Sequence, residues 1–243
     1  MRGWPEGCEQ PQWRQLCTFS RGMNAFPESG YLTDLKRRRA LTARALAVVL
    51  RAGEEVADED FDRLAAGAGR IPSAGLKATP LAVATRALRM LTGGEPSRVL
   101  DACSGIGKLS IVGALTTTAV FTGVERRLSL VRASRAAALR FGARRTTFLH
   151  GDVEHLALGA FDAIYLFDPE DPTGGKGEDA QEVGDSAVSR WSVSSTLSTW
   201  RGLSRARPGT RIVTYHCQVE PPDCHLIRRE VAGEGELALF EKQ

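Results

Sequence analysis

Short runs of apolar residues alternate with stretches of helical spacing through the last two-thirds of this chain. Five such runs occupy residues 98–102, 119–124, 146–150, 161–167 and 211–215. Each run is short enough for a buried strand, and strands that alternate with helices form parallel sheets with crossover connections. The pattern therefore predicts an α/β fold built on a mostly parallel sheet.

Two further apolar runs, 226–231 and 236–240, lie so close together in the sequence that only a hairpin can join them. One of these strands must then run antiparallel to its neighbours. We therefore predict a seven-stranded, Rossmann-like sheet that is mostly parallel and ends in a C-terminal antiparallel hairpin. Dinucleotide dehydrogenases, in contrast, usually continue with further crossovers or a second domain.

Helical spacing dominates the residues that precede the first predicted strand. Apolar positions predict helices over 33–51 and 58–66, and Thr79 before Pro80 predicts the capped start of a third helix, which ends at Gly93. Residues 1–30 show no periodicity and are expected to form an irregular arm of unassigned role. We therefore divide the chain into an N-terminal arm and helical extension, residues 1–75, and a sheet domain, residues 76–243.

Composition narrows the class of protein. The chain has 243 residues, of which 42% are hydrophobic and 25% charged, as in ordinary globular proteins. Its start has no apolar run of the secretory type, and no stretch approaches a membrane span. The five cysteines are an odd number in a chain long enough to fold without disulfides. These features predict a cytoplasmic protein with reduced thiols and no membrane partner.

A glycine-rich loop follows the first predicted strand. The strand runs into Asp101, and Cys103, Gly105 and Gly107 lead from it to a helix that begins near Lys108. Glycines let a ligand approach the backbone closely, and a helix N-terminus favours the negative end of a bound molecule. Asp101 suits an ammonium group of the same ligand. Cys103 is interpreted as a small residue that fits the loop.

Acidic residues also end the next two strands. Glu125 follows Gly105 by 20 residues, a spacing at which a carboxylate suits two ribose hydroxyls. After the third strand, Asp152 offers an acceptor for an adenine amine, and Val153 offers an apolar neighbour for the ring. The carboxyl ends of parallel strands meet at one edge of a sheet, so these residues are expected to line one crevice.

The fourth predicted strand ends in Phe167 and is followed by Asp168 and Pro169. We expect the oxygen atoms of Asp168 and of the backbone around Pro169 to position an amine, and Phe167 to form a wall beside it. Residues 173–189 are rich in Gly, Asp and Glu and are expected to form a mobile loop. Whether this loop closes over a substrate stays open.

With these residues in view, the chain from about residue 79 onward resembles the class I S-adenosylmethionine-dependent methyltransferases. The resemblance implies an enzyme that uses S-adenosyl-L-methionine and no metal. It assigns methyl transfer to Phe167, Asp168 and Pro169. The residues that it assigns to the cofactor are Thr79, Asp101, Cys103, Gly105, Gly107, Glu125, Asp152 and Val153.

Two narrower resemblances point to different acceptors. Thr79-Pro80 and residues 123–125 are similar to the Dot1 branch of protein-lysine methyltransferases, although Leu76-Lys77-Ala78 replaces its tyrosine-glycine-glutamate. Asp168-Pro169 is similar to the Asp-Pro-Pro loops of base amino methyltransferases, although Glu170 replaces the later residues of that motif. The expected acceptor is therefore a nitrogen on a protein or on RNA, while a small-molecule amine or hydroxyl stays an alternative.

The same residues also allow other interpretations. A non-catalytic module could bind the cofactor with the same loop, and a nicotinamide site fits Gly105 and Gly107, although Asp101 stands where that motif is apolar. The pairs His216-Cys217 and Cys224-His225 invite a zinc site, but their spacing matches no standard one. Seven arginines and no acid lie between residues 126 and 150, on a helix whose Leu128, Val131 and Leu139 are expected to face inward. The arginines indicate a solvated helix face or a distant RNA contact.

Overall fold

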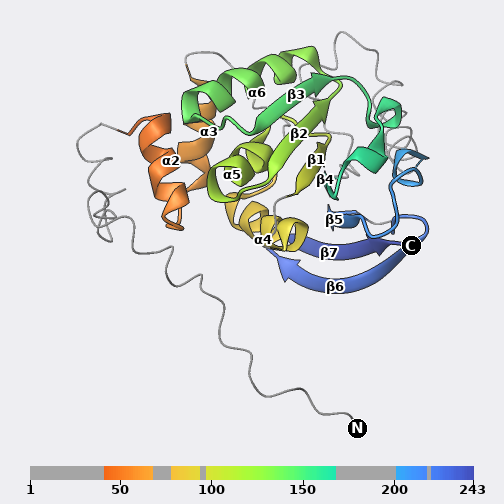
Figure 1. The fold of residues 1–243 in the computed structure, drawn as a ribbon. Helices are drawn as coiled ribbons and strands as arrows, with labels where there is room; N and C mark the ends of the chain where they lie inside the picture. Colours follow the sequence, from red (N-terminus) through yellow and green to blue (C-terminus); the bar gives the residue numbers. More distant parts are fainter. Residues whose placement is uncertain (1–40, 68–77, 94–96, 168–200, 218–219) are drawn as a thin grey trace, which may run out of the picture.

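The computed structural model describes residues 41–67, 78–93, 97–167, 201–217 and 220–243. Its centre is a seven-stranded sheet of order β3-β2-β1-β4-β5-β7-β6 (Figure 1). The strands are β1 (Arg98–Ala102), β2 (Val120–Glu125), β3 (Thr146–His150), β4 (Ala163–Phe167), β5 (Arg211–Tyr215), β6 (Cys224–Ala232) and β7 (Gly235–Lys242). Their bounds differ from the predicted ones by at most two residues.

The pairing of the strands confirms the predicted class of sheet. Strands β1 to β5 pair in parallel, whereas β7 pairs antiparallel with both β5 and β6. The hairpin formed by β6 and β7 inserts its second strand next to β5, so β6 becomes an edge strand and β3 forms the opposite edge. The sequence pattern had required this antiparallel strand.

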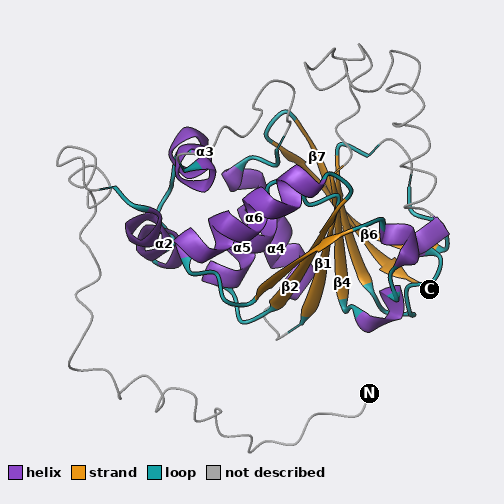
Figure 2. Ribbon diagram, turned by 90° about the horizontal axis from the view of Figure 1, so that it is seen from above, coloured by secondary structure: helices purple, strands orange, loops and turns teal. Residues whose placement is uncertain are grey.

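Helices cover one face of the sheet in two layers (Figure 2). The inner layer contains α4 (Leu81–Thr92), α5 (Lys108–Thr116) and α6 (Leu128–Phe141), and α2 (Ala43–Arg51) and α3 (Asp58–Ala66) lie outside it. The other face carries the short turns η2 (Val153–His155) and η3 (Leu158–Ala160) and the helical residues 201–203. No helix among these is long and apolar enough to cross a membrane.

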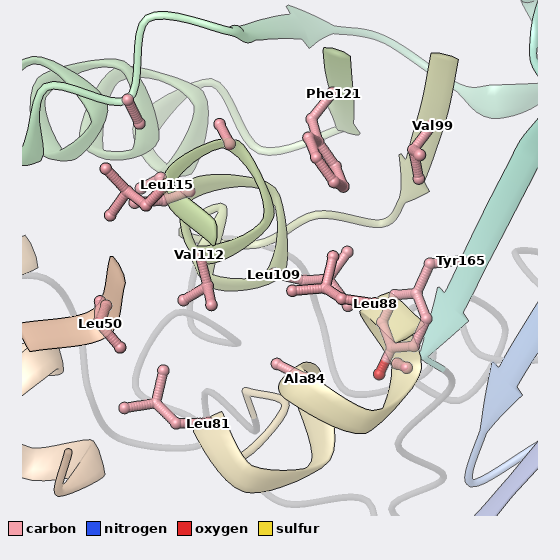
Figure 3. Close-up of a cluster of buried hydrophobic side chains, with 14 of the residues drawn as sticks. Leu50, Leu81, Ala84, Leu88, Val99, Leu109, Val112, Leu115, Phe121 and Tyr165 are labelled. Carbon is pink, nitrogen blue, oxygen red and sulfur yellow. The ribbon is translucent and has the colours of Figure 1, made fainter. Parts of the chain in front are cut away.

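Each face of the sheet has its own hydrophobic core because side chains alternate along a strand. In β4, Ala163 and Tyr165 join the core beneath the helices, while Ile164 and Leu166 join the core on the other face. Figure 3 shows Tyr165 within the first core, among side chains that α4 and α5 contribute. Because α2 and α3 also contribute buried residues to that core, the helical extension packs against α5 and α6.

Two details of the helices differ from the sequence-based expectation. The helix expected over 33–51 begins at Ala43, because Thr42 is its N-cap and accepts a hydrogen bond from the Ala45 backbone N–H at 3.2 Å; residues 33–40 lie outside the described residues. In α6, Leu128 and Leu139 were expected to face inward, but they are 41% and 77% exposed. The helix is instead anchored by buried residues that include Val131 and Phe141.

The third helix also starts differently from the prediction. Pro80 is the N-cap of α4, so Thr79 lies one residue too early to cap it. The first free backbone N–H, that of Leu81, donates instead to the Asp58 carboxylate of α3, at 3.0 Å and 3.3 Å to its two oxygens. A contact from a distant segment has therefore replaced the local cap that the sequence suggested.

Candidate functional site

A pocket opens at the carboxyl edge of the sheet between β1 and β4. The strand order reverses there, since the chain passes from β1 to β2 on one side and from β4 to β5 on the other, and open α/β sheets bind ligands at such a position. Five residues predicted from the sequence line this pocket: Thr79, Asp101, Cys103, Gly105 and Phe167. The rest of its lining comes from Ala78, Ser104, Ile106, Lys108, Leu109 and Tyr165.

Asp101 provides a buried carboxyl group at the end of β1. It is 3% exposed, and its Oδ2 accepts a hydrogen bond from the Ser110 hydroxyl at 2.7 Å. Burial raises the pKa of Asp101 from its ordinary 3.8 to about 7, although hydrogen bonds from the Ser110 side chain and backbone oppose the rise. Burial disfavours the ionised form of this carboxyl group, whereas a nearby ammonium group stabilises it. The position therefore suits a bound cation.

The N-terminus of α5 faces the same pocket. Its N-cap is Gly107, with φ of 76°, and a glycine has no side chain that could accept a capping hydrogen bond. Within the first turn, the Ser110 hydroxyl donates its hydrogen bond to Asp101, while Lys108 and Leu109 line the pocket. The first backbone N–H groups of a helix lack partners within the helix and favour negative charge. A carboxylate next to α5 and an ammonium next to Asp101 would therefore both be stabilised.

The two glycines of the loop are required for different reasons. A Cβ on Gly107 would lie 2.5 Å from the Phe148 ring, so this position is closed by packing within the protein. A Cβ on Gly105 would meet nothing within 4 Å, although φ there is 55°. Gly105 therefore borders open space where a ligand can approach the backbone. Cys103 adopts φ of 62°, a conformation rare for residues with side chains and frequent at functional sites.

Glu125 is tied to the loop from the end of β2. It is 7% exposed, and its Oε2 accepts a hydrogen bond from the Gly105 backbone N–H at 3.1 Å. Its Oε1 accepts from the Arg127 backbone N–H at 2.8 Å and from Arg127 Nε at 3.2 Å. Glu125 thus shapes the loop besides being a candidate for ribose binding.

The residues expected beside the adenine lie outside the pocket lining. Asp152 accepts hydrogen bonds from Arg126 and from the Glu154 backbone N–H, the latter at 3.0 Å, and is the N-cap of η2. Val153 is buried in the core on the far face of the sheet. Both follow β3, which pairs with β2 so that His150 is the register partner of Glu125.

An aromatic row that the sequence did not reveal extends from the pocket along the ends of β4 and β5. The Phe167 ring, which lines the pocket, is centred 5.3 Å from the Tyr215 ring, and Tyr215 meets His216 edge-on at 4.4 Å. His216 has φ of 57°, and a Cβ on Gly235 would lie 2.5 Å from its Nε2. Asp168 and Pro169 continue from Phe167 but lie outside the described residues, as does the predicted loop 173–189.

The sequence also did not reveal a group of ion pairs beside the pocket, in which a buried lysine meets two partly exposed carboxylates. Lys108 is 4% exposed, and its Nζ lies 2.7 Å from Asp58 Oδ1 and 2.8 Å from Asp62 Oδ1, both on α3. The same Asp58 carboxylate caps α4, so it joins the starts of α4 and α5. The two acidic partners of Lys108 lie about 50 residues earlier in the sequence, where no local pattern connects them to the lysine.

The zinc hypothesis gains no support from the described part of the chain. Within it, no three side chains from His, Cys, Asp and Glu gather where they could hold a metal ion. Cys217 and Cys224 instead pack against the core on the far face of the sheet.

No protein-family model and no curated protein sequence matches this chain, but many solved structures share its arrangement. TrmN from Thermus thermophilus superimposes with a TM-score of 0.53 over 72% of this chain, at 23% identity. The chain has the class I methyltransferase fold. An RNA methyltransferase from Salinibacter ruber, in complex with S-adenosyl-L-homocysteine, gives 0.50 over 68% of this chain and 93% of its own, at 19% identity. The match covers 52% of TrmN, so this chain spans about half of that protein.

Proposed function

We propose that this protein is an S-adenosylmethionine-dependent methyltransferase that modifies a nitrogen atom of a nucleic acid. One observation carries the proposal: a buried carboxyl group, Asp101, and the N-terminus of α5 face one pocket at the point where the strand order reverses. An amino-acid ligand presents an ammonium and a carboxylate side by side, and these two features complement both groups.

Two further features of the glycine-rich loop favour this cofactor. Gly105 leaves open space beside its backbone, and the Ser104 hydroxyl is buried without a hydrogen-bond partner among the described residues. We assign the methionine end to Asp101 and the start of α5, the ribose to Glu125, and the adenine to Asp152. Val153 is buried in the core on the far face of the sheet, so it is left out of this assignment. When bound, the cofactor supplies a methyl group on a sulfonium, which is open to direct displacement.

The chain's own task is then to orient an acceptor and keep water away. We assign the positioning of the acceptor nitrogen to Asp168 and the backbone carbonyls around Pro169, and the wall beside it to Phe167. The nitrogen must be uncharged to attack, which a desolvated channel favours. No nucleophilic side chain is required, because the acceptor nitrogen itself would form the bond to the methyl carbon, with the thioether S-adenosylhomocysteine as the leaving group.

Two features favour a nucleic acid over a protein lysine as the acceptor. Phe167 lines the pocket, and the exposed ring of His216 is centred 6.0 Å from it, so these two rings offer flat surfaces there. Aromatic side chains stack on bases taken out of a helix. A solved structure with this fold is an RNA methyltransferase by its description. A protein lysine and a small-molecule amine are the alternatives that the experiment must distinguish.

The proposal is tested in two stages. Calorimetry with S-adenosylmethionine, S-adenosylhomocysteine and NAD should show binding of the first two. Incubation with methyl-labelled cofactor and fractionated cell extract should then place the label in RNA or DNA. Binding of NAD alone would contradict the proposal, label in protein or metabolites would change the acceptor, and binding without any transfer would indicate a non-catalytic module.

A further inference from the structure

A groove of about 690 Å³ lies on the outside of the sheet, along the edge strand β3. Three arginines from three different segments line it: Arg44 of α2, Arg135 of α6, and Arg144 in the turn before β3. Leu139 and Leu149 provide an apolar part of the lining, and Leu139 is 77% exposed. The groove is thus both strongly basic and partly apolar.

None of the three guanidinium groups has a carboxylate partner among the described residues. Arg44 donates to the Leu139 carbonyl at 3.3 Å, and Arg135 donates to the Phe148 carbonyl at 3.1 Å and 2.6 Å. These bonds orient the side chains but leave their charge uncompensated, because a backbone carbonyl is neutral. Arg144 is exposed and forms no side-chain hydrogen bond or ion pair among the described residues.

This absence of acids distinguishes the groove from the surface along β6. On the opposite edge of the sheet, Arg228 lies 2.6 Å from Glu230, and Arg229 contacts both Glu220 and Glu236. Such a mixture of positive and negative side chains is typical of a surface that is only solvated, because opposite charges reduce mutual repulsion. Arg135 also protects the open edge of β3 by covering the Phe148 carbonyl. That role does not explain Arg44 or Arg144, which do not bond to β3.

We propose that this groove binds the phosphate backbone of the acceptor nucleic acid, at a site separate from the cofactor pocket. Guanidinium groups bind phosphates in bidentate fashion, and neutralising phosphates releases counterions from the polyanion. Nucleic acid is favoured over an acidic protein because it is the acceptor class of the proposed function, and in that respect the groove rests on that function. The exposed leucine fits either ligand.

The position of the groove sets the size of the ligand. The chain leaves β2 at the carboxyl edge and runs back along α6, so the end of α6 and Arg144 lie at the amino edge of the sheet. The cofactor pocket opens at the other edge, one strand length away. Strand β3 has five residues, which corresponds to about 16 Å at 3.3 Å per residue. A ligand that reaches both sites must therefore be several nucleotides long.

The test measures the affinity for a fluorescein-labelled RNA hairpin by anisotropy at several salt concentrations. Arg144→Gln is the main variant, because this side chain supports no other part of the described structure. Its matched control is Arg228→Gln, which removes the same charge at the opposite edge of the sheet. Each lost phosphate contact should lower the slope of log affinity against log salt by about 0.7 to 0.9. Arg144→Gln should show that loss and a several-fold weaker affinity, and Arg228→Gln neither.

A triple variant, Arg44→Gln with Arg135→Gln and Arg144→Gln, should lower the slope by about 2 to 3. Equal slopes for wild type, Arg144→Gln and the control would overturn the proposal, as would the absence of any RNA binding by the wild type. Binding of polyglutamate that depends on Arg144 when RNA binding does not would assign the groove to an acidic protein. Calorimetry with S-adenosylmethionine separates the two proposals: the cofactor affinity of Arg144→Gln should stay unchanged, and failure of cofactor binding by the wild type would contradict the proposed function alone.

Discussion

Replacement of Asp101 by asparagine should stabilise the cofactor-free protein at neutral and alkaline pH. The folded carboxyl group has a pKa of about 7, against an ordinary value of 3.8 that applies to the unfolded chain. Below pH 3.8 the group is protonated in both states, so it has no effect on the free energy of unfolding. Above that pH the unfolded chain loses its proton first, and the folded state becomes progressively less stable until about pH 7.

The size of the effect follows from the difference between the two pKa values. One pKa unit equals about 1.4 kcal/mol, so ionised Asp101 costs the folded protein about 4 kcal/mol at pH 8 and about 1.6 kcal/mol at pH 5. Asparagine can still accept the hydrogen bond from Ser110 but carries no charge. The stability advantage of Asp101→Asn should therefore grow by roughly 3 kcal/mol between pH 5 and pH 8, and its melting temperature at pH 8 should exceed that of the wild type by several degrees.

Urea unfolding of both proteins at the two pH values measures this difference, and Glu55→Gln, which changes an exposed carboxyl group, is the matched control. In the same variant, cofactor affinity should fall by about 1.5–3 kcal/mol, because the ammonium loses its charged partner. Wild-type affinity should also weaken as pH falls below 7. An advantage of Asp101→Asn that does not change with pH, or no advantage at all, would refute the desolvation of Asp101 in the pocket.

Three further predictions concern the loop and the acceptor side. Glu125→Ala should weaken cofactor binding by about 1.5–3 kcal/mol in a folded protein, and an unchanged dissociation constant by calorimetry would remove it from the ribose role. Gly107→Ala should destabilise the protein by about 1–3 kcal/mol in urea unfolding, because it adds backbone strain and a clash with Phe148. Gly105→Ala should lower cofactor affinity more than it lowers stability. A larger loss of stability than of affinity would contradict the ligand-facing role of Gly105. Asp168→Ala should change cofactor affinity by less than about tenfold while labelled methyl transfer falls on the order of a hundredfold, and a parallel loss of both would assign Asp168 to the cofactor.

The sheet could be predicted from the sequence because the residues that define each strand are neighbours in the sequence. A buried strand needs a short apolar run, and the two runs at the C-terminus allow only a hairpin, so β7 could be foreseen as an antiparallel strand. The loop was equally readable, since Asp101, Gly105 and Gly107 follow one another within seven residues. These residues do meet at the pocket, except that Gly107 is committed to packing against Phe148.

The rest depended on contacts between distant segments. Thr79 looked like a cap, but Asp58 satisfies the start of α4, and the Thr79 hydroxyl lies 2.9 Å from that of Tyr165. Leu139 fitted an inward stripe of α6, yet it borders the basic groove. His216 could not be predicted as part of an aromatic row, because its left-handed backbone conformation and the space above Gly235 appear only when β5 and β7 are in place.

The double use of Asp58 has a consequence for how this protein can be divided. Its carboxylate accepts a hydrogen bond from the first backbone N–H of α4. Together with Asp62 it also neutralises the ammonium group of Lys108 in the first turn of α5. A chain that began at residue 76 would keep every strand but would lose both carboxylates beside Lys108 and expose the apolar surface of α5 and α6 that α2 and α3 cover. Supplying residues 41–67 as a separate peptide should then restore the missing counter-charges. The segment that precedes the sheet in the sequence is therefore part of the structural support of the glycine-rich loop.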